Sequence, residues 1–116
     1  MSEIKIYHNP RCSKSREALA LLQEQGINPE ITEYLQDAPD ANEIRHILDL
    51  LGVPVREIMR TGEPIYKELN LGSGALSEDD LINAMVEHPI LMERPIVIYG
   101  NQARVGRPPK LVLEIL

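Results

Sequence analysis

The chain has 116 residues and a formal net charge of −6, with 43% hydrophobic and 26% charged residues. This length allows one domain with one hydrophobic core, and the composition is that of a soluble globular protein. The excess of acidic residues argues against general nucleic-acid binding, which needs a basic surface. No apolar run approaches the roughly 20 residues of a membrane-spanning helix, and no signal peptide is recognisable.

The first part of the chain predicts a βαβ unit. Residues 4–7 alternate in hydropathy as a strand does, and residues 13–25 carry apolar side chains at helical spacing up to Gly26. Residues 30–35 are expected to form a second strand, with Ile31 and Leu35 among its apolar positions. Two strands joined through one helix are expected to run parallel.

The middle of the chain predicts helices. Asp40 with Glu43 resembles a capping box at the start of a helix that Gly52 ends, and Ser77 with Asp80 resembles another. The helices expected from these signals cover residues 40–51, 54–59 and 77–86. We therefore expect a helical insert at about residues 40–90.

The last part returns to strands. Residues 95–99 are typical of a buried strand, Gly100-Asn101 predicts a hairpin turn, and residues 102–105 form the returning strand. A short apolar helix is expected over residues 111–116. The whole order predicts a single α/β domain over residues 1–116 of the thioredoxin-like (glutaredoxin-like) class.

Cys12 is the only cysteine of the chain. A single thiol cannot form an intramolecular disulfide or a multi-cysteine metal site, so we expect no bound metal or cofactor. Thiols stay reduced in the cytoplasm, which is the expected location. The spacing also excludes a C-x-x-C dithiol motif, because Ser15 stands where the second cysteine would be. It excludes a C-x₅-R phosphatase loop as well, because Ala18 stands where the arginine would be. A monothiol needs an external thiol to complete a redox cycle.

The position of Cys12 at the first strand-to-helix turn favours a reactive thiolate. Unpaired N–H groups and the dipole at a helix N-terminus stabilise an anion, and cations such as His8 and Arg11 add to the effect. Ser15 is expected to donate a hydrogen bond to the sulfur. The alternatives are a small buried apolar cysteine, which the polar neighbours disfavour, and for His8 a simple turn residue.

Three arginines are expected at the ends of elements, where functional sites are built. Arg60 follows a helix, Arg94 precedes Pro95 at the start of a strand, and Arg107 lies in a proline-rich loop. In thioredoxin-like folds the proline at the position of Pro95 is commonly cis and faces the cysteine turn. Guanidinium groups bind tetrahedral oxyanions well, although each arginine taken alone is better explained by a surface ion pair. Arg45 and Arg56, in amphipathic helices, are expected to be solvated.

Several segments resemble the glutaredoxin-coupled arsenate reductase (ArsC) family. Residues 8–16 match its H-N-P-x-C-x-x-S-R signature, and residues 94–97 match its R-P-I-V motif. Further similar segments are Glu33-Tyr34-Leu35, Tyr66-Lys67-Glu68-Leu69 and Arg107-Pro108. The resemblance covers nearly the whole chain at matching separations.

The resemblance implies a role for each candidate residue. Cys12 would attack arsenate, His8 and Ser15 would help to hold the thiolate, and the following three would bind the oxyanion: Arg60, Arg94 and Arg107. Glutathione would be the co-substrate and glutaredoxin the protein partner of a monomeric enzyme. Reduction of As(V) to As(III) takes two electrons, so one cysteine needs an outside thiol.

Two other functions remain open on the sequence. Relatives of this fold include transcriptional regulators that dock on RNA polymerase, but these usually sense redox state through C-x-x-C, which is absent here. A glutathione-linked monothiol reductase for another substrate would share Cys12 and differ at the oxyanion pocket. Lys14, where many family members carry a smaller neutral residue, marks a departure that bears on this choice.

Overall fold

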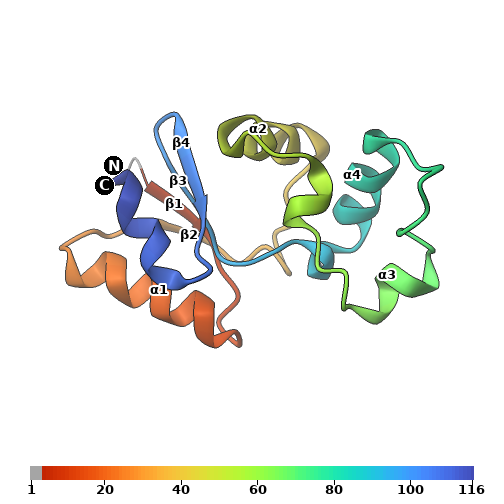
Figure 1. Cartoon of the computed structure of the whole chain (residues 1–116). Coiled ribbons are helices and arrows are strands. Elements are labelled where there is room, and N and C mark those ends of the chain that lie inside the picture. Colours follow the sequence, from red (N-terminus) through yellow and green to blue (C-terminus); the bar gives the residue numbers. More distant parts are fainter. Residues whose placement is uncertain (1–3) are drawn as a thin grey trace. The chain divides into compact units, whose positions relative to one another are not determined.

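The computed structural model describes residues 4–116, and these divide into two compact units. One unit comprises the residues up to Asp37 together with Arg94–Leu116, and the other comprises Ala38–Glu93 (Figure 1). The first contains the sheet and Cys12, and the second is helical. Each unit is described by itself below.

A four-stranded sheet forms the centre of the first unit. Its strands are β1 (Ile4–Tyr7), β2 (Glu30–Thr32), β3 (Ile96–Tyr99) and β4 (Gln102–Val105). The order is β2-β1-β3-β4, with β2 parallel to β1 and the other two pairs antiparallel. With the helix between β1 and β2, this is a mixed α/β fold of the thioredoxin-like class, as the order of elements predicts.

Two helical segments complete the core of this unit. Helix α1 (Ser13–Glu24) packs against the 3-10 helix η3 (Pro109–Ile115), which also packs on β4. Their apolar side chains join those of β1 and β3 in one buried cluster: Ile4, Ile6, Ala18, Leu22, Val97, Val112 and Ile115. Burial of this cluster holds the strands together, and the loops around Cys12 all start at one end of the sheet, where Tyr7, Ile96 and Val105 are paired neighbours.

Strand β2 is shorter than the sequence indicates. The strand ends at Thr32 and residues 34–36 form a turn instead of continuing the predicted strand, and Ile31 and Leu35 are 46% and 41% exposed. The reason is that β2 is an outer strand of the sheet, paired with β1 alone, so the alternation of its side chains is not enforced by burial on two faces. The last element also differs, because it is a 3-10 helix and begins at Pro109.

The second unit consists of short helices. Its elements are α2 (Ala41–Leu51), η1 (Val55–Ile58), α3 (Pro64–Glu68), α4 (Glu78–Glu87) and η2 (Pro89–Leu91). Asp40 caps α2 by accepting the N–H of Glu43, and Ser77 and Asp80 form a full capping box on α4. Helix α4 packs on α2, η1 and η2. The sequence does not predict α3 and η2, because helices as short as these show no measurable periodicity in their apolar residues.

Arg56 is not solvated as expected. Its guanidinium donates to Tyr66 Oη at 3.0 Å, to the carbonyl of Leu71 at 2.8 Å and to that of Ser73 at 2.9 Å. These bonds tie η1 to the loop after α3, which has little apolar surface of its own to hold it. Arg45 does lie at the surface, where it pairs with Asp79 at 3.1 Å.

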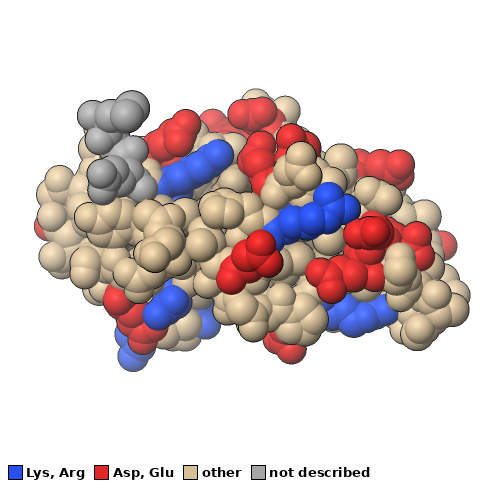
Figure 2. Space-filling view, turned by 90° about the horizontal axis from the view of Figure 1, so that it is seen from above, with Lys and Arg blue, Asp and Glu red and all other residues tan. Residues whose placement is uncertain are grey.

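The surface reflects the acidic composition. On the face drawn in Figure 2, acidic side chains are more widespread than basic ones, as the net charge of −6 implies. Within residues 4–116, no helix is both long enough and apolar enough to cross a membrane.

Candidate active site around Cys12

Cys12 is the N-cap residue of helix α1. Its backbone is extended, with φ −95° and ψ 123°, while its carbonyl already accepts the N–H of Arg16 at 3.0 Å. The side chain of an N-cap residue faces the unpaired N–H groups of the first turn. No cap hydrogen bond of ordinary geometry forms, but the sulfur lies where these N–H groups and the helix dipole act on it.

The surroundings of the half-buried thiol favour its thiolate form. Burial raises the pKa of Cys12, but the N–H groups of Ser15 and Lys14 and a hydrogen bond from Arg94 lower it by more. The net effect places the pKa of Cys12 below its ordinary value of 9.0. Because only the thiolate is a good nucleophile, the site is prepared for attack on an electrophile.

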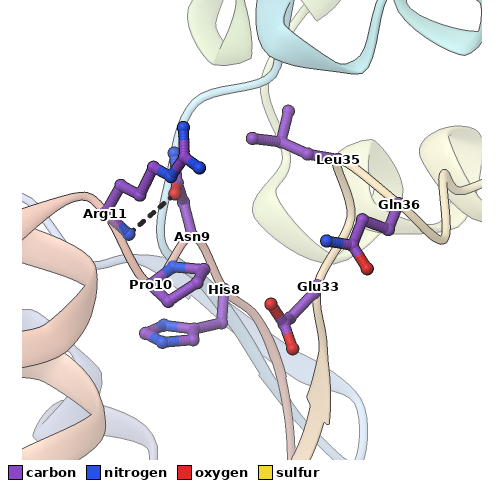
Figure 3. A pocket seen from close by; sticks show the side chains of 7 residues that line it. All are labelled: His8, Asn9, Pro10, Arg11, Glu33, Leu35 and Gln36. Atoms are coloured by element: carbon purple, nitrogen blue, oxygen red, sulfur yellow. Dashed lines mark hydrogen bonds between the residues drawn. The ribbon is translucent and has the colours of Figure 1, made fainter.

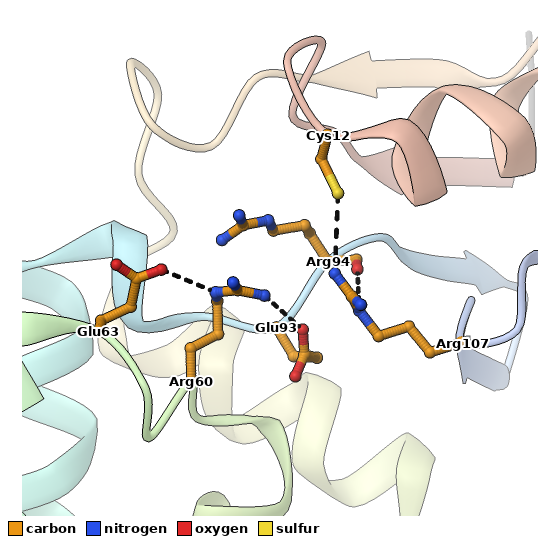
Figure 4. A network of polar contacts seen from close by, with 6 residues as sticks. All are labelled: Cys12, Arg60, Glu63, Glu93, Arg94 and Arg107. Atoms are coloured by element: carbon orange, nitrogen blue, oxygen red, sulfur yellow. Dashed lines mark hydrogen bonds and ion pairs between the residues drawn. The ribbon is translucent and has the colours of Figure 1, made fainter.

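Arg94 and Arg107 come to the sulfur from two loops of the same unit. Arg107 Nη2 lies 3.7 Å from Cys12 Sγ, and Arg107 Nε donates to the carbonyl of Arg94 at 2.9 Å (Figure 4). The second bond orients the Arg107 guanidinium against the main chain that carries Arg94. Two guanidinium groups beside one thiolate form a place where an oxyanion can bind next to the nucleophile.

Close packing between the two loops sets the positions of these arginines. The N–H of Gly106 donates to the carbonyl of Pro95 at 2.9 Å, and both Arg94–Pro95 and Arg107–Pro108 are cis peptides. A Cβ on Gly106 would lie 2.7 Å from Pro95 Cγ and 3.1 Å from Val112 Cγ1. Glycine is therefore required here for space.

The loop before Cys12 is held by a buried polar network. Ser15 Oγ, fully buried, lies 2.6 Å from His8 Nδ1 and accepts the N–H of Asn9 at 3.0 Å. Asn9 Oδ1 accepts the N–H of Arg11 at 3.0 Å, and the carbonyl of Asn9 accepts the N–H of Cys12 at 3.0 Å. These bonds tie the loop to the first turn of α1 and support the main chain at Cys12.

This network changes the expected roles of His8 and Ser15. The hydroxyl of Ser15 is directed to His8 and Asn9 and not to the sulfur, and Ser15 supports the thiol through its backbone N–H. Burial lowers the pKa of His8 below 6.5, Glu33 raises it and Arg16 lowers it further. His8 is therefore neutral near pH 7 and does not supply the expected positive charge.

Arg60 lies in the other unit and has partners there. Its Nε and Nη1 donate to Glu63 and Glu93, each at 3.0 Å (Figure 4). Burial lowers the pKa of Arg60, but the two carboxylates raise it by more, so the group stays charged. Its expected part in binding an oxyanion stays a prediction.

Sequence analysis did not single out Asn9 or Glu33. The side chain of Asn9 shapes the turn before Cys12, and the carboxylate of Glu33 acts on His8. Asn-Pro is a common turn dipeptide, and this signal could have identified Asn9. No comparable signal exists for Glu33, which reaches His8 only because β1 and β2 are parallel neighbours.

Among residues 4–116, no group of three or more His, Cys, Asp or Glu side chains is arranged to hold a metal ion.

The four-stranded sheet, with Cys12 at the N-terminus of the helix that follows β1, makes this a thioredoxin-like α/β protein. Within this class the chain belongs to the ArsC family, whose model matches residues 7–115. It is 54% identical to an arsenate reductase of Haemophilus influenzae over 96% of this chain and 97% of the relative. It is 56% identical to the uncharacterized protein YfgD of Escherichia coli K12 over 98% of this chain and 97% of that protein.

The fold is equally close to a solved structure. An arsenate reductase from Vibrio cholerae superposes with a TM-score of 0.96 at 56% identity, covering 97% of both chains.

Proposed function

We propose that this protein is an oxidoreductase that reduces arsenate to arsenite through Cys12. The observation that carries the proposal is the contact of the activated sulfur with Arg107 and Arg94. The family and the arsenate reductases among its relatives support arsenate as the substrate. A protein-docking role would not need two guanidinium groups at the sulfur.

The reaction balances with one external thiol. The thiolate of Cys12 attacks As(V) and displaces one oxygen, which leaves as water after taking up protons, to give a Cys12–S–As(V) adduct. The thiolate of glutathione then forms a disulfide with the Cys12 sulfur, and the electron pair of the S–As bond stays on arsenic as arsenite leaves. Two thiols have lost two electrons in total, and arsenic has gained two.

Arg94 and Arg107 stabilise the negative charge of this pathway. Arsenate is a tetrahedral oxyanion that would otherwise be repelled by a thiolate and by a protein of net charge −6. Paired guanidinium groups provide local positive charge, and repulsion from distant acidic groups is screened over about 8 Å in physiological salt. The arginines therefore act on binding and on the charge of the adduct.

The mixed disulfide between Cys12 and glutathione must be reduced before the next turnover. The thiolate of glutaredoxin attacks the glutathione sulfur and releases the thiolate of Cys12. A second glutathione then takes the first from glutaredoxin as glutathione disulfide. No bound cofactor is needed in this scheme, and it operates in the cytoplasm, where glutathione is reduced.

A coupled assay tests the proposal. Purified protein receives arsenate, glutathione, glutaredoxin, glutathione reductase and NADPH, with the wild type beside Cys12→Ser and Arg94→Ala. We expect arsenate-dependent NADPH oxidation that is lost in Cys12→Ser and strongly reduced in Arg94→Ala, with both variants folded by circular dichroism. No turnover, with Cys12 still rapidly alkylated by iodoacetamide at neutral pH, would reject arsenate and retain the thiolate.

The role of Arg60 is tested in the same assay. If Arg60 binds the oxyanion, Arg60→Ala raises the KM for arsenate. Glu93→Gln, which removes one of the carboxylates that hold Arg60, is the matched comparison because it keeps the guanidinium. Unchanged kinetics in a folded Arg60→Ala variant would restrict the role of Arg60 to its ion pairs.

A further inference from the structure

A cavity of about 250 Å³ lies beside the loop that carries Cys12, wholly within the first unit. One wall is the loop after β1, and the other is the turn that follows β2 (Figure 3). Its lining residues are His8, Asn9, Pro10, Arg11, Glu33, Leu35 and Gln36. The cavity thus opens at the carboxyl ends of two parallel strands, where ligands of α/β sheets commonly bind.

The cavity presents charges of both signs. Figure 3 shows Arg11 on one wall and Glu33 on the other. Among residues 4–116, no hydrogen bond or ion pair engages the guanidinium of Arg11 or the carboxylate of Glu33. Neither charge is therefore used in holding the fold, and they are far enough apart to leave each other unpaired.

The remaining lining suits a small peptide-like molecule. Leu35, 41% exposed, and the ring of Pro10 offer apolar surface, and Gln36 offers an amide that both donates and accepts. The volume is just below the range of about 300–1,000 Å³ typical of small-molecule sites, so a macromolecule is not the ligand that fits it.

We propose that this cavity binds the external thiol of the reaction, a small zwitterionic thiol in which a carboxylate pairs with Arg11 and an ammonium group pairs with Glu33. The inference rests on the proposed function, which requires such a thiol. Position supports it, because Arg11 immediately precedes Cys12 and the cavity wall therefore begins one residue from the nucleophile. Neither Cys12 nor the arginines that contact its sulfur, Arg94 and Arg107, line the cavity. The cavity would therefore hold the charged ends of the thiol, while the oxyanion binds at the arginines.

Kinetics with two thiols distinguishes an effect on thiol binding in the cavity from an effect on the chemistry at Cys12. Glutathione carries the proposed charges, and 2-mercaptoethanol carries none. We expect Arg11→Gln and Glu33→Gln each to raise the KM for glutathione roughly tenfold, the loss of one charge-assisted hydrogen bond. The KM for 2-mercaptoethanol, used in place of glutathione, should change far less, because this thiol carries no charge that could pair with either group.

Glu30→Gln is the matched control, because Glu30 is an exposed carboxylate of β2 that does not line the cavity. We expect it to leave the KM for glutathione at the wild-type value. An equal loss with both thiols in Arg11→Gln or Glu33→Gln would assign the effect to Cys12 and overturn the proposal. An unchanged KM for glutathione in both variants would overturn it as well, while arsenate turnover itself would still stand.

Direct binding tests the cavity without turnover. Cys12→Ser protein is titrated with S-methylglutathione, which cannot react, and amide chemical shifts are followed by NMR. We expect the shifts to concentrate in residues 8–11 and 33–36 and to weaken in Glu33→Gln. Shifts concentrated elsewhere, or none at millimolar ligand, would reject the site even if arsenate reduction is confirmed.

Discussion

The groups that lower the pKa of Cys12 come from separate parts of the chain. The N–H groups of Lys14 and Ser15 are supplied by the helix that Cys12 itself begins, whereas Arg94 is supplied by the loop before β3. The first contribution is a property of local sequence and remains in any variant that keeps the helix. The second can be removed by a single substitution.

Arg94→Ala is therefore expected to raise the pKa of Cys12. The rate of alkylation by iodoacetamide as a function of pH should show a midpoint below 9.0 in the wild type and a higher midpoint in the variant. Arg104→Ala, which removes an exposed arginine paired with Glu114 in the same unit, should leave the midpoint unchanged. Coincident curves for wild type and Arg94→Ala would show that Arg94 does not stabilise the thiolate.

His8 gives the fold a pH dependence whose sign follows from its burial. Because the pKa of His8 is lowered from 6.5, the unfolded chain binds a proton that the folded chain does not as the pH falls below 6.5. The free energy of unfolding should therefore decrease with falling pH, from pH 6.5 down to the lower pKa of the folded state. Urea unfolding between pH 8 and pH 5 measures this, and the decrease should be smaller in His8→Gln. A slope that is the same in both proteins would contradict it.

The candidate residues show where sequence reasoning succeeds and where it stops. Cys12 could be assigned to a helix N-terminus because a strand, a turn and a helix follow each other within a few residues. The predicted hydrogen bond from the Ser15 hydroxyl to the sulfur is wrong, because the hydroxyl lies against His8. This contact depends on how the turn closes, which residue spacing does not determine. The ion pair of Arg60 with Glu93 also could not be predicted, since 33 residues separate the two in the chain.

At the scale of elements, the loop from β4 to η3 depends on Gly106. A methyl group at this position would press on Pro95 and on the buried side chain of Val112. Gly106→Ala should lower the free energy of unfolding by roughly 1–3 kcal/mol, the usual cost of overpacking. Gly74→Ala is the control, because nothing lies within 4 Å of a Cβ there. Equal stability of the two variants by urea unfolding would show that the loop yields without cost.

Helix α4 depends on its capping box. Ser77 Oγ accepts the N–H of Asp80 at 3.1 Å, and Asp80 returns a bond to the N–H of Ser77 at 2.9 Å. Ser77→Ala should cost about 1 kcal/mol in urea unfolding, whereas Ser77→Asp, which keeps an acceptor, should recover most of it. An equal loss of unfolding free energy in both variants would mean that a side-chain acceptor at position 77 does not stabilise the helix.

The elements that could be predicted are those with strong local signals. Caps at Asp40 and Ser77 and the turn at Gly100 fixed three boundaries within a residue or two. The extent of β2 could not be predicted, because it is decided by pairing with β1 and not by its own residues. The same holds for α3, which is kept in place by bonds from Arg56 outside it.

On the scale of the whole molecule, the chain crosses between its two units at only two places, after Asp37 and after Glu93. The second crossing joins residues with different tasks: Glu93 pairs with Arg60, and Arg94 supports the sulfur of Cys12. The order of elements predicted the α/β fold because each part of the sheet has its own local signal. The pairing of Glu93 with Arg60 had no such signal, because 33 residues separate the two in the chain.

The short outer strands of the sheet have a consequence for self-association. Order β2-β1-β3-β4 leaves two edges, and the strands there have three and four residues. Glu30 and Arg104 place charges on these edges, which discourages strands of neighbouring molecules from adding to the sheet. The protein should sediment as a monomer at high concentration, whereas Glu30→Val, which leaves a valine beside exposed Ile31, should form aggregates that bind thioflavin T. The charges on the two edge strands would then determine how long the protein stays soluble in storage, independently of catalysis.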